Sequence, residues 1–149
     1  MKNKLVSFLL ALTLLVSMIP ISFAANTETP VIETIDLGDG FVAEITFSPI
    51  YSSDTMYISN SISRGKSATV RLNGQRIGTF ELYGTFTYDG SSSKAIDDSW
   101  DATAISRYDY DGDSYCSGSS VKGSCTFIGD GYSKTASLTI TCDRNGNIS

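Results

Sequence analysis

The sequence contains no histidine, and this absence removes several kinds of active site at once. Ser-His-Asp hydrolysis, activation of a cysteine nucleophile by histidine, and zinc or iron centres with imidazole ligands all need that side chain. Basic residues are also scarce, with 11 lysines and arginines against 16 aspartates and glutamates in 149 residues. An acidic chain without a basic run repels phosphate backbones, so we expect no binding to nucleic acids.

Leucine is rare beyond the first two dozen residues, and no helical pattern occurs there. Four leucines remain in that part of the chain: Leu37, Leu72, Leu82 and Leu138. No window places apolar residues at spacings of three and four over three turns, which is the pattern of an amphipathic helix. Apolar residues still make up 41% of the chain, so we expect a folded, β-rich protein and not a disordered one.

The N-terminus begins as a secretory signal peptide does. Lys2 and Lys4 supply the positive start, and the apolar stretch Leu5–Ile19 follows. This stretch is long enough for the hydrophobic part of a signal peptide and short for a membrane-spanning helix. A proline then breaks it, and small residues precede Ala25 at the two positions that a signal peptidase reads. We therefore predict a signal peptide over residues 1–24, with an uncleaved N-terminal anchor as the alternative.

Cleavage before Ala25 has consequences for charge, compartment and size. Loss of two lysines from the 11 basic residues leaves 9 against 16 acidic ones, a net charge of −7. No cysteine stands at the junction and no second apolar run of spanning length follows, so we expect a secreted, extracellular protein without a membrane anchor in the mature chain. Residues 25–30 are polar and include a proline, which predicts a flexible N-terminal arm. The remaining residues, 31–149, suffice for one domain and not two.

Alternation of apolar and polar residues predicts strands in the mature chain. The run Phe41–Phe47 alternates with period two, and Val70–Leu72 leads into Asn73-Gly74. An Asn-Gly pair is the strongest short hairpin signal, because both residues tolerate positive φ. The partner strand, predicted over Gln75–Tyr88, has one apolar and one polar face, as expected where one side of a sheet is buried and the other is wet.

Further strands and turns follow towards the C-terminus. A strand is predicted over Trp100–Tyr110, ended by a turn at Asp111-Gly112. A last hairpin is predicted from Val121–Ile128 and Thr135–Ile140 around Gly129–Gly131. About seven short strands with Gly- or Asp-rich turns predict an all-β fold, a single antiparallel β-sandwich that is immunoglobulin-like in the broad sense. A small β-barrel is the alternative.

Two runs of the chain carry a recognisable pattern. They are Gly78–Gly90, with the sequence GTFELYGTFTYDG, and Leu138–Ser149, with the sequence LTITCDRNGNIS. Together they resemble a group of small secreted proteins of Gram-positive, clostridia-like bacteria, which have a signal peptide, one β-rich domain, a hairpin like GTFTYNG and an ending like LTC-x-x-NG-x-(L/I)-S. The resemblance covers the part of the chain from Ser67 onward and implies the secreted location and the β-rich fold. The group has no established activity, so the resemblance implies no catalytic residues.

Three cysteines lie in the last third of the chain. In an exported protein we expect two of them to pair. Cys116 and Cys125 enclose a short Ser/Gly-rich segment, and loop closure favours a disulfide between them. Cys142 is the alternative partner of either one, because its predicted strand returns towards Val121. The chain has no Cys-x-x-Cys pair and no activating base, so we expect no redox catalysis.

Acidic residues alternate in one short run, at Asp109, Asp111 and Asp113. Carboxylates so spaced in a glycine-containing turn can converge on one hard cation such as calcium. An EF-hand loop that starts at Asp109 needs glycine and glutamate where Ser114 and Ser120 stand, so that motif is absent. An ordinary solvated turn is the alternative, and we expect no other cofactor.

Three further aspartates surround the single tryptophan. Asp97, Asp98 and Asp101 flank Trp100. Two carboxylates beside an exposed aromatic ring can form a glycosidase pair or a platform for sugars. This hydrolase interpretation requires that one of the three aspartates face another carboxylate in a pocket. We favour the alternative, in which acidic surface residues flank a tryptophan of the core.

Tyrosine is abundant, with eight residues against one tryptophan. Four candidates for ligand binding lie in the last third of the chain: Tyr108, Tyr110, Tyr115 and Tyr132. Tyrosine together with serine, glycine and aspartate is the composition of adaptable binding loops. Ordinary strand propensity also accounts for these tyrosines, and it is the more frequent reason for such a composition.

These features favour a secreted, non-enzymatic binding module. Its loops between Asp109 and Gly131 are predicted to contact an extracellular protein, a cell surface or a glycan. A small secreted effector or antagonistic protein is the second hypothesis, and a carboxylate-based hydrolase is the third. The sequence identifies no particular ligand.

Overall fold

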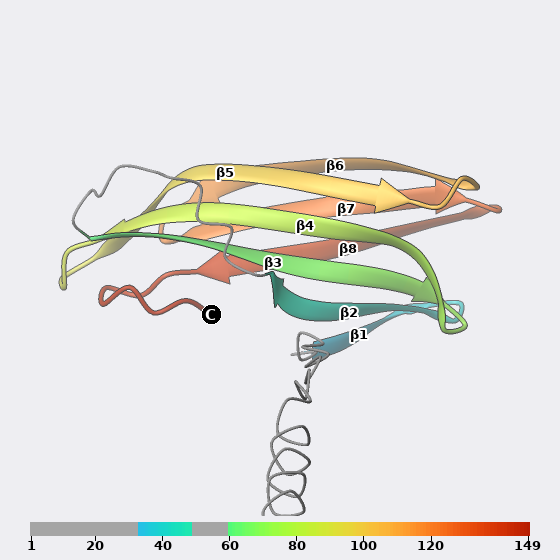
Figure 1. The fold of residues 1–149 in the computed structure, drawn as a ribbon, viewed down its shortest axis with the longest axis horizontal. Coiled ribbons are helices and arrows are strands. Elements are labelled where there is room, and N and C mark those ends of the chain that lie inside the picture. Colours follow the sequence, from blue (N-terminus) through green and yellow to red (C-terminus); the bar gives the residue numbers. More distant parts are fainter. Residues whose placement is uncertain (1–32, 49–59) are drawn as a thin grey trace, which may run out of the picture.

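Every regular element in the described part of the chain is a β-strand. The computed structural model describes residues 33–48 and 60–149, which form eight antiparallel strands in two sheets packed face to face (Figure 1). The predicted β-sandwich is thus confirmed, and the barrel alternative is wrong because neither sheet closes on itself. The predicted signal peptide, 1–24, and the predicted arm, 25–30, lie outside the described residues.

The strands follow one another in a simple order. The larger sheet consists of β1 (Glu33–Gly38), β2 (Phe41–Ser48), β3 (Ser61–Leu72), β4 (Gln75–Tyr88) and β5 (Ser93–Ala104). The smaller sheet consists of β6 (Tyr108–Ser117), β7 (Ser120–Gly129) and β8 (Tyr132–Thr141). Neighbours in the sequence are neighbours in each sheet, so the likeness to immunoglobulin domains lies in the sandwich architecture and not in the strand order. Within residues 33–48 and 60–149, no helix is long and apolar enough to cross a membrane.

The predicted hairpin at Asn73-Gly74 is confirmed. Both residues have positive φ, 50° for Asn73 and 83° for Gly74, and they join β3 to β4. The predicted strand over Gln75–Tyr88 coincides with β4. In this strand Phe80, Leu82 and Phe86 are buried in the core, while Glu81, Tyr83 and Thr85 lie on the opposite face.

The predicted strand over Trp100–Tyr110 and the turn at Asp111-Gly112 are wrong. The chain turns earlier, after Ala104, where the backbone N–H of Tyr108 donates to the carbonyl oxygen of Ile105 at 2.9 Å. Strand β6 then runs straight through Gly112. A Cβ at Gly112 would lie 3.1 Å from the Trp100 ring, so this glycine allows β6 to pack closely against the tryptophan and does not make a turn.

The two sheets approach so closely that some inward positions have no room for a side chain. A Cβ at Gly78 of β4 would lie 2.4 Å from the Phe127 ring and 2.4 Å from the Thr103 carbonyl oxygen. Phe127 belongs to β7 and is 1% exposed. Its ring therefore occupies the space that a larger residue at position 78 would need.

Two lysines link the sheets along β8. Lys66 of β3 donates a hydrogen bond of 2.9 Å to the carbonyl oxygen of Thr139. Lys134 of β8 donates one of 2.9 Å to the carbonyl oxygen of Leu37. Each ammonium group also lies over a phenylalanine ring of β2, 5.2 and 5.6 Å from the ring centroids. Burial lowers the pKa of Lys66, and the negative charge of Glu33 opposes this shift.

Replacement of Gly78 by alanine should destabilise the fold by about 1–3 kcal/mol, because the added methyl group overpacks the contact with Phe127. Thr79→Val is the matched control, since Thr79 is the next residue in β4 and lies on the outer face. Its effect should stay within about 0.5 kcal/mol. Urea unfolding of both variants checks this, and equal midpoints for the two would contradict the packing described.

Candidate functional site

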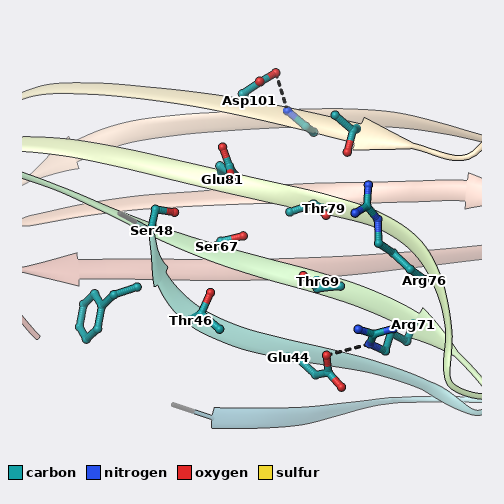
Figure 2. Close-up of a pocket in the computed structure, with 13 residues that line it drawn as sticks. Glu44, Thr46, Ser48, Ser67, Thr69, Arg71, Arg76, Thr79, Glu81 and Asp101 are labelled. Atoms are coloured by element: carbon teal, nitrogen blue, oxygen red, sulfur yellow. Dashed lines mark hydrogen bonds and ion pairs between the residues drawn. The ribbon is translucent and has the colours of Figure 1, made fainter. Parts of the chain in front are cut away.

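A groove of about 730 Å³ lies on the outer face of the five-stranded sheet (Figure 2). Its described residues come from β2, β3, β4 and β5, and the polar ones among them lie on the face turned away from the core. Serine and threonine form the floor, and longer charged side chains form the rim. The residues that define it are Ser48, Ser67, Thr69 and Thr79 on the floor and Glu44, Arg71, Arg76, Glu81 and Asp101 around it.

Strand register brings these residues together in rows. Thr46, Ser67, Glu81 and Asp101 stand opposite one another on four consecutive strands. Directly opposed residues of an antiparallel pair point to the same side of the sheet, so each row crosses the groove from edge to edge. Small side chains in the middle of the rows leave the sheet face hollow there.

The rim carries charges of both signs. Arg71 Nε lies 2.7 Å from Glu44 Oε2, and the Arg71 guanidinium also donates to the carbonyl oxygen of Gly74 at 3.3 Å. Arg76 stands opposite Arg71 in the register and is exposed. Arg76 makes no ion pair with any residue of the described ranges. Its donors are therefore available to a ligand.

Two acidic residues stand opposite each other in the register of β4 and β5. Glu81 is directly opposite Asp101, and both line the groove. The Tyr83 hydroxyl donates to Glu81 Oε2 at 2.5 Å, while Asp101 Oδ1 accepts the backbone N–H of Ala102 at 2.8 Å. Glu81 is thus the acidic neighbour of Asp101 in the groove, and the sequence analysis did not identify it.

The other two aspartates near the tryptophan lie elsewhere. Asp98 is on the inner side of β5, where its carboxylate accepts hydrogen bonds from Ser114 Oγ at 2.5 Å and from Cys116 Sγ at 3.2 Å. Asp97 is exposed and outside the groove. Trp100 packs against the core, 6.4 Å from Phe80 between ring centroids. The tryptophan is thus half-buried beside the core and provides no open platform.

Ser48 carries a buried hydroxyl without a partner. The residue is 4% exposed, and its Oγ makes no hydrogen bond. Figure 2 shows this oxygen directed along the groove towards Ser67. A buried polar group that stays unpaired costs about 1–3 kcal/mol, so a ligand atom that pairs with it gains affinity.

The four tyrosines predicted to bind a ligand do not share one surface. Tyr108 is 5% exposed and belongs to the core. Tyr115 is exposed, but it stands seven positions farther along β6, roughly 23 Å away at the rise of an extended strand. Tyr110 and Tyr132 are also exposed, and the Tyr132 ring packs on Phe41 at 5.2 Å between centroids. The segment that was expected to form loops is instead a regular hairpin of β6 and β7.

The three aspartates of the predicted calcium site do not converge. Asp109, Asp111 and Asp113 occupy alternate positions of β6, and an extended strand separates successive ones by about 7 Å. Asp113 instead accepts a hydrogen bond of 2.8 Å from Ser124 Oγ. In the described ranges no three Asp, Glu, Cys or His side chains gather closely enough to hold a metal ion.

The predicted disulfide is not formed, and all three cysteines are free thiols. Cys116 pairs in register with Val121, and Cys125 pairs with Gly112, so the two cysteines are four positions apart along β6 and β7. That offset is about 13 Å, whereas a disulfide needs Cα atoms within about 7 Å. Strand β7 separates Cys142 from Cys116 by about 10 Å, which rules out that pair as well.

Comparison of the chain with protein-family models, with curated proteins and with solved structures finds no match. The groove itself was missed in the sequence, although part of its signal was present. The polar face of β4, with Thr79 and Glu81, was identified as a face turned to water. Only the pairing with β3 and β5 shows that this face is hollow.

Cys116 should react slowly with alkylating reagents in spite of its exposure. Burial of the sulfur, with the hydrogen bond to Asp98, raises the pKa of this thiol to about 11, and only the thiolate is nucleophilic. Asp98→Asn lowers that pKa and should speed iodoacetamide labelling of Cys116 at pH 8 severalfold. Peptide mass spectrometry measures the rate, with Asp97→Asn as the control. Equal rates in both variants would show that the Asp98 contact does not govern the thiol.

Proposed function

We propose that this protein is a secreted, non-enzymatic binding module that holds a hydroxyl-rich ligand, an oligosaccharide, in the groove of the five-stranded sheet. The unpaired and buried Ser48 hydroxyl is the observation that carries the proposal. It marks a place where the protein lacks a hydrogen-bond partner that a ligand supplies. The secreted location rests on the predicted signal peptide.

The chemistry of the lining favours a sugar. Hydroxyl groups of a sugar both donate and accept hydrogen bonds, and the groove offers both functions. Arg76 supplies donors, Glu81 and Asp101 supply acceptors, and the serines and threonines of the floor do either. The volume of about 730 Å³ lies in the range of about 300–1,000 Å³ that is usual for ligand sites.

The balance of charge favours a neutral ligand. Among the described residues, three carboxylates and two guanidinium groups line the groove, and Glu44 and Arg71 already form an ion pair. A phosphorylated ligand would meet the repulsion of Glu81 and Asp101, while a cationic one would meet Arg76. An uncharged, polar chain avoids both costs.

The floor of the groove is also well suited to bind without rearrangement. Its side chains stand on hydrogen-bonded strands and not on loops, so their positions are set by the sheet. Less conformational entropy is lost on binding when the protein side is rigid beforehand. The hairpin of β6 and β7, which was the predicted contact surface, contributes no residue to this groove.

Filling the groove should abolish ligand binding without unfolding the protein. Thr69→Trp places an indole on the floor, at an outer-face position of the central strand β3. Thr126→Trp is the matched control, because Thr126 is on the outer face of β7, the central strand of the other sheet. A glycan array probed with the purified protein should show binding that Thr69→Trp reduces at least tenfold.

The control variant Thr126→Trp should bind as the unmodified protein does. Equal loss in both variants, or no glycan binding by the unmodified protein, would refute the proposal. In the latter case growth inhibition of neighbouring cells would favour the effector hypothesis.

Hydrolysis of the bound sugar is the second candidate function, favoured by the opposition of Glu81 and Asp101. Directly opposed residues have Cβ atoms about 4.5–5.5 Å apart. Retaining glycosidases use a pair of carboxyl groups about 5–5.5 Å apart, and two neighbouring acidic residues are the first requirement of such a mechanism. If this function holds, the purified protein cleaves the sugar that it binds, and Glu81→Gln and Asp101→Asn each abolish cleavage while binding persists.

Asp97→Asn is the control for that experiment, since Asp97 is outside the groove. Mass spectrometry of the sugar after incubation detects the products. An uncut sugar eliminates the hydrolase and leaves the binding function in place.

A further inference from the structure

A second pocket, of about 470 Å³, lies where β3 begins and the chain ends. Its lining comes from the end of β2, the start of β3 and the C-terminal segment: Phe47, Ile62, Arg64, Gly146, Asn147 and Ile148. Of the six described residues that line it, three have large apolar side chains, so its chemistry differs from that of the first groove. Among the described residues, Phe47 is the one that lines both sites.

The C-terminal segment forms a well-ordered wall of this pocket. Beyond β8 the chain turns back on itself (Figure 1), and Thr141 and Ser149 exchange backbone hydrogen bonds of 2.9 and 3.0 Å. The Asp143 carboxylate accepts the backbone N–H of Asn147 at 2.9 Å and its side-chain amide at 2.8 Å. Ile148 is thereby held half-buried against the core.

Arg64 places a positive charge beside these apolar side chains, without a neighbouring negative charge among the described residues. It occupies an inward-facing position of β3, directly opposite Gly84, so no side chain across the strand pair competes for its space. The residue is half-buried, and its guanidinium is charged at any ordinary pH. Within residues 33–48 and 60–149 its side chain has no hydrogen bond or ion pair.

Within the described part of the chain, the other half-buried cations all have an acceptor for their side chains, unlike Arg64. Arg71 pairs with Glu44, and Lys66 and Lys134 each donate to a backbone carbonyl oxygen. Of the four such cations in the described ranges, Arg64 alone lacks an acceptor. A partly desolvated charge without a partner is costly, and an anion that enters the pocket removes that cost.

We propose that this pocket binds a fatty acid, with the carboxylate on Arg64 and the alkyl chain along Phe47, Ile62 and Ile148. A guanidinium matches a carboxylate with two parallel hydrogen bonds. The three apolar side chains gain about 25 cal/mol for each Å² of apolar surface that the alkyl chain covers. Inorganic anions lack the apolar part, and sugars lack the charge, so neither satisfies both halves of the pocket. This site is independent of the function proposed for the groove.

Calorimetric titration of the purified protein with decanoate, below its micelle concentration, tests the proposal. We expect saturable binding to one site, weakened at least tenfold in Arg64→Gln. Decanol, which has the same chain without the charge, should also bind at least tenfold more weakly. Arg76→Gln is the matched control, because it removes a guanidinium from the other site, and it should bind decanoate as the unmodified protein does.

Two further measurements on the unmodified protein test the proposal even if the Arg64→Gln variant folds poorly. Lengthening the acid from octanoate to dodecanoate should tighten binding to the unmodified protein, because each added methylene group is covered by the apolar wall. A short peptide with a free C-terminal leucine should bind more weakly than decanoate. Equal binding of decanol and decanoate, unchanged binding by Arg64→Gln, or tighter binding of the peptide would each overturn the assignment.

Discussion

The close approach of the two sheets is the constraint on which the rest of this structure depends. Aromatic rings of one sheet fill spaces that the other sheet leaves open at glycine, as the Phe127 ring does at Gly78. Because such contacts tolerate no added atom, they hold the strands in one register relative to each other. That register in turn decides which polar side chains stand side by side on the outer faces.

The polar groove follows from this arrangement and not from any local motif. With apolar residues turned inward, β3, β4 and β5 present serine, threonine and charged side chains outward, and small residues fall in the middle of the rows. The sandwich supplies a rigid floor, and the rim charges of both signs suit a neutral, hydroxylated ligand. Glu81 and Asp101 stand opposite each other on the same surface.

The two sites differ in chemistry because they lie on different faces of the larger sheet. The groove uses outward residues, where water competes and hydrogen bonds give selectivity. The second pocket lies at the end of the sandwich, where Ile62 and Ile148 pack against the core and Arg64 introduces a charge. A charge at an inward position is costly to the fold, and Lys66 and Lys134 offset this cost with hydrogen bonds to backbone carbonyl oxygens.

The sequence by itself determined the features that depend on near neighbours. The alternation in Gln75–Tyr88 predicted β4, and Asn73-Gly74 predicted its hairpin, because strand period and positive φ are local properties. The turn predicted at Gly112 was wrong, because glycine occurs both in turns and where two strands pack closely. The unpaired thiols, the separated tyrosines, the opposition of Glu81 to Asp101 and the isolation of Arg64 were decided only by tertiary structure. Each depends on which strands pair and in what register, and residues far apart in the chain set that register together.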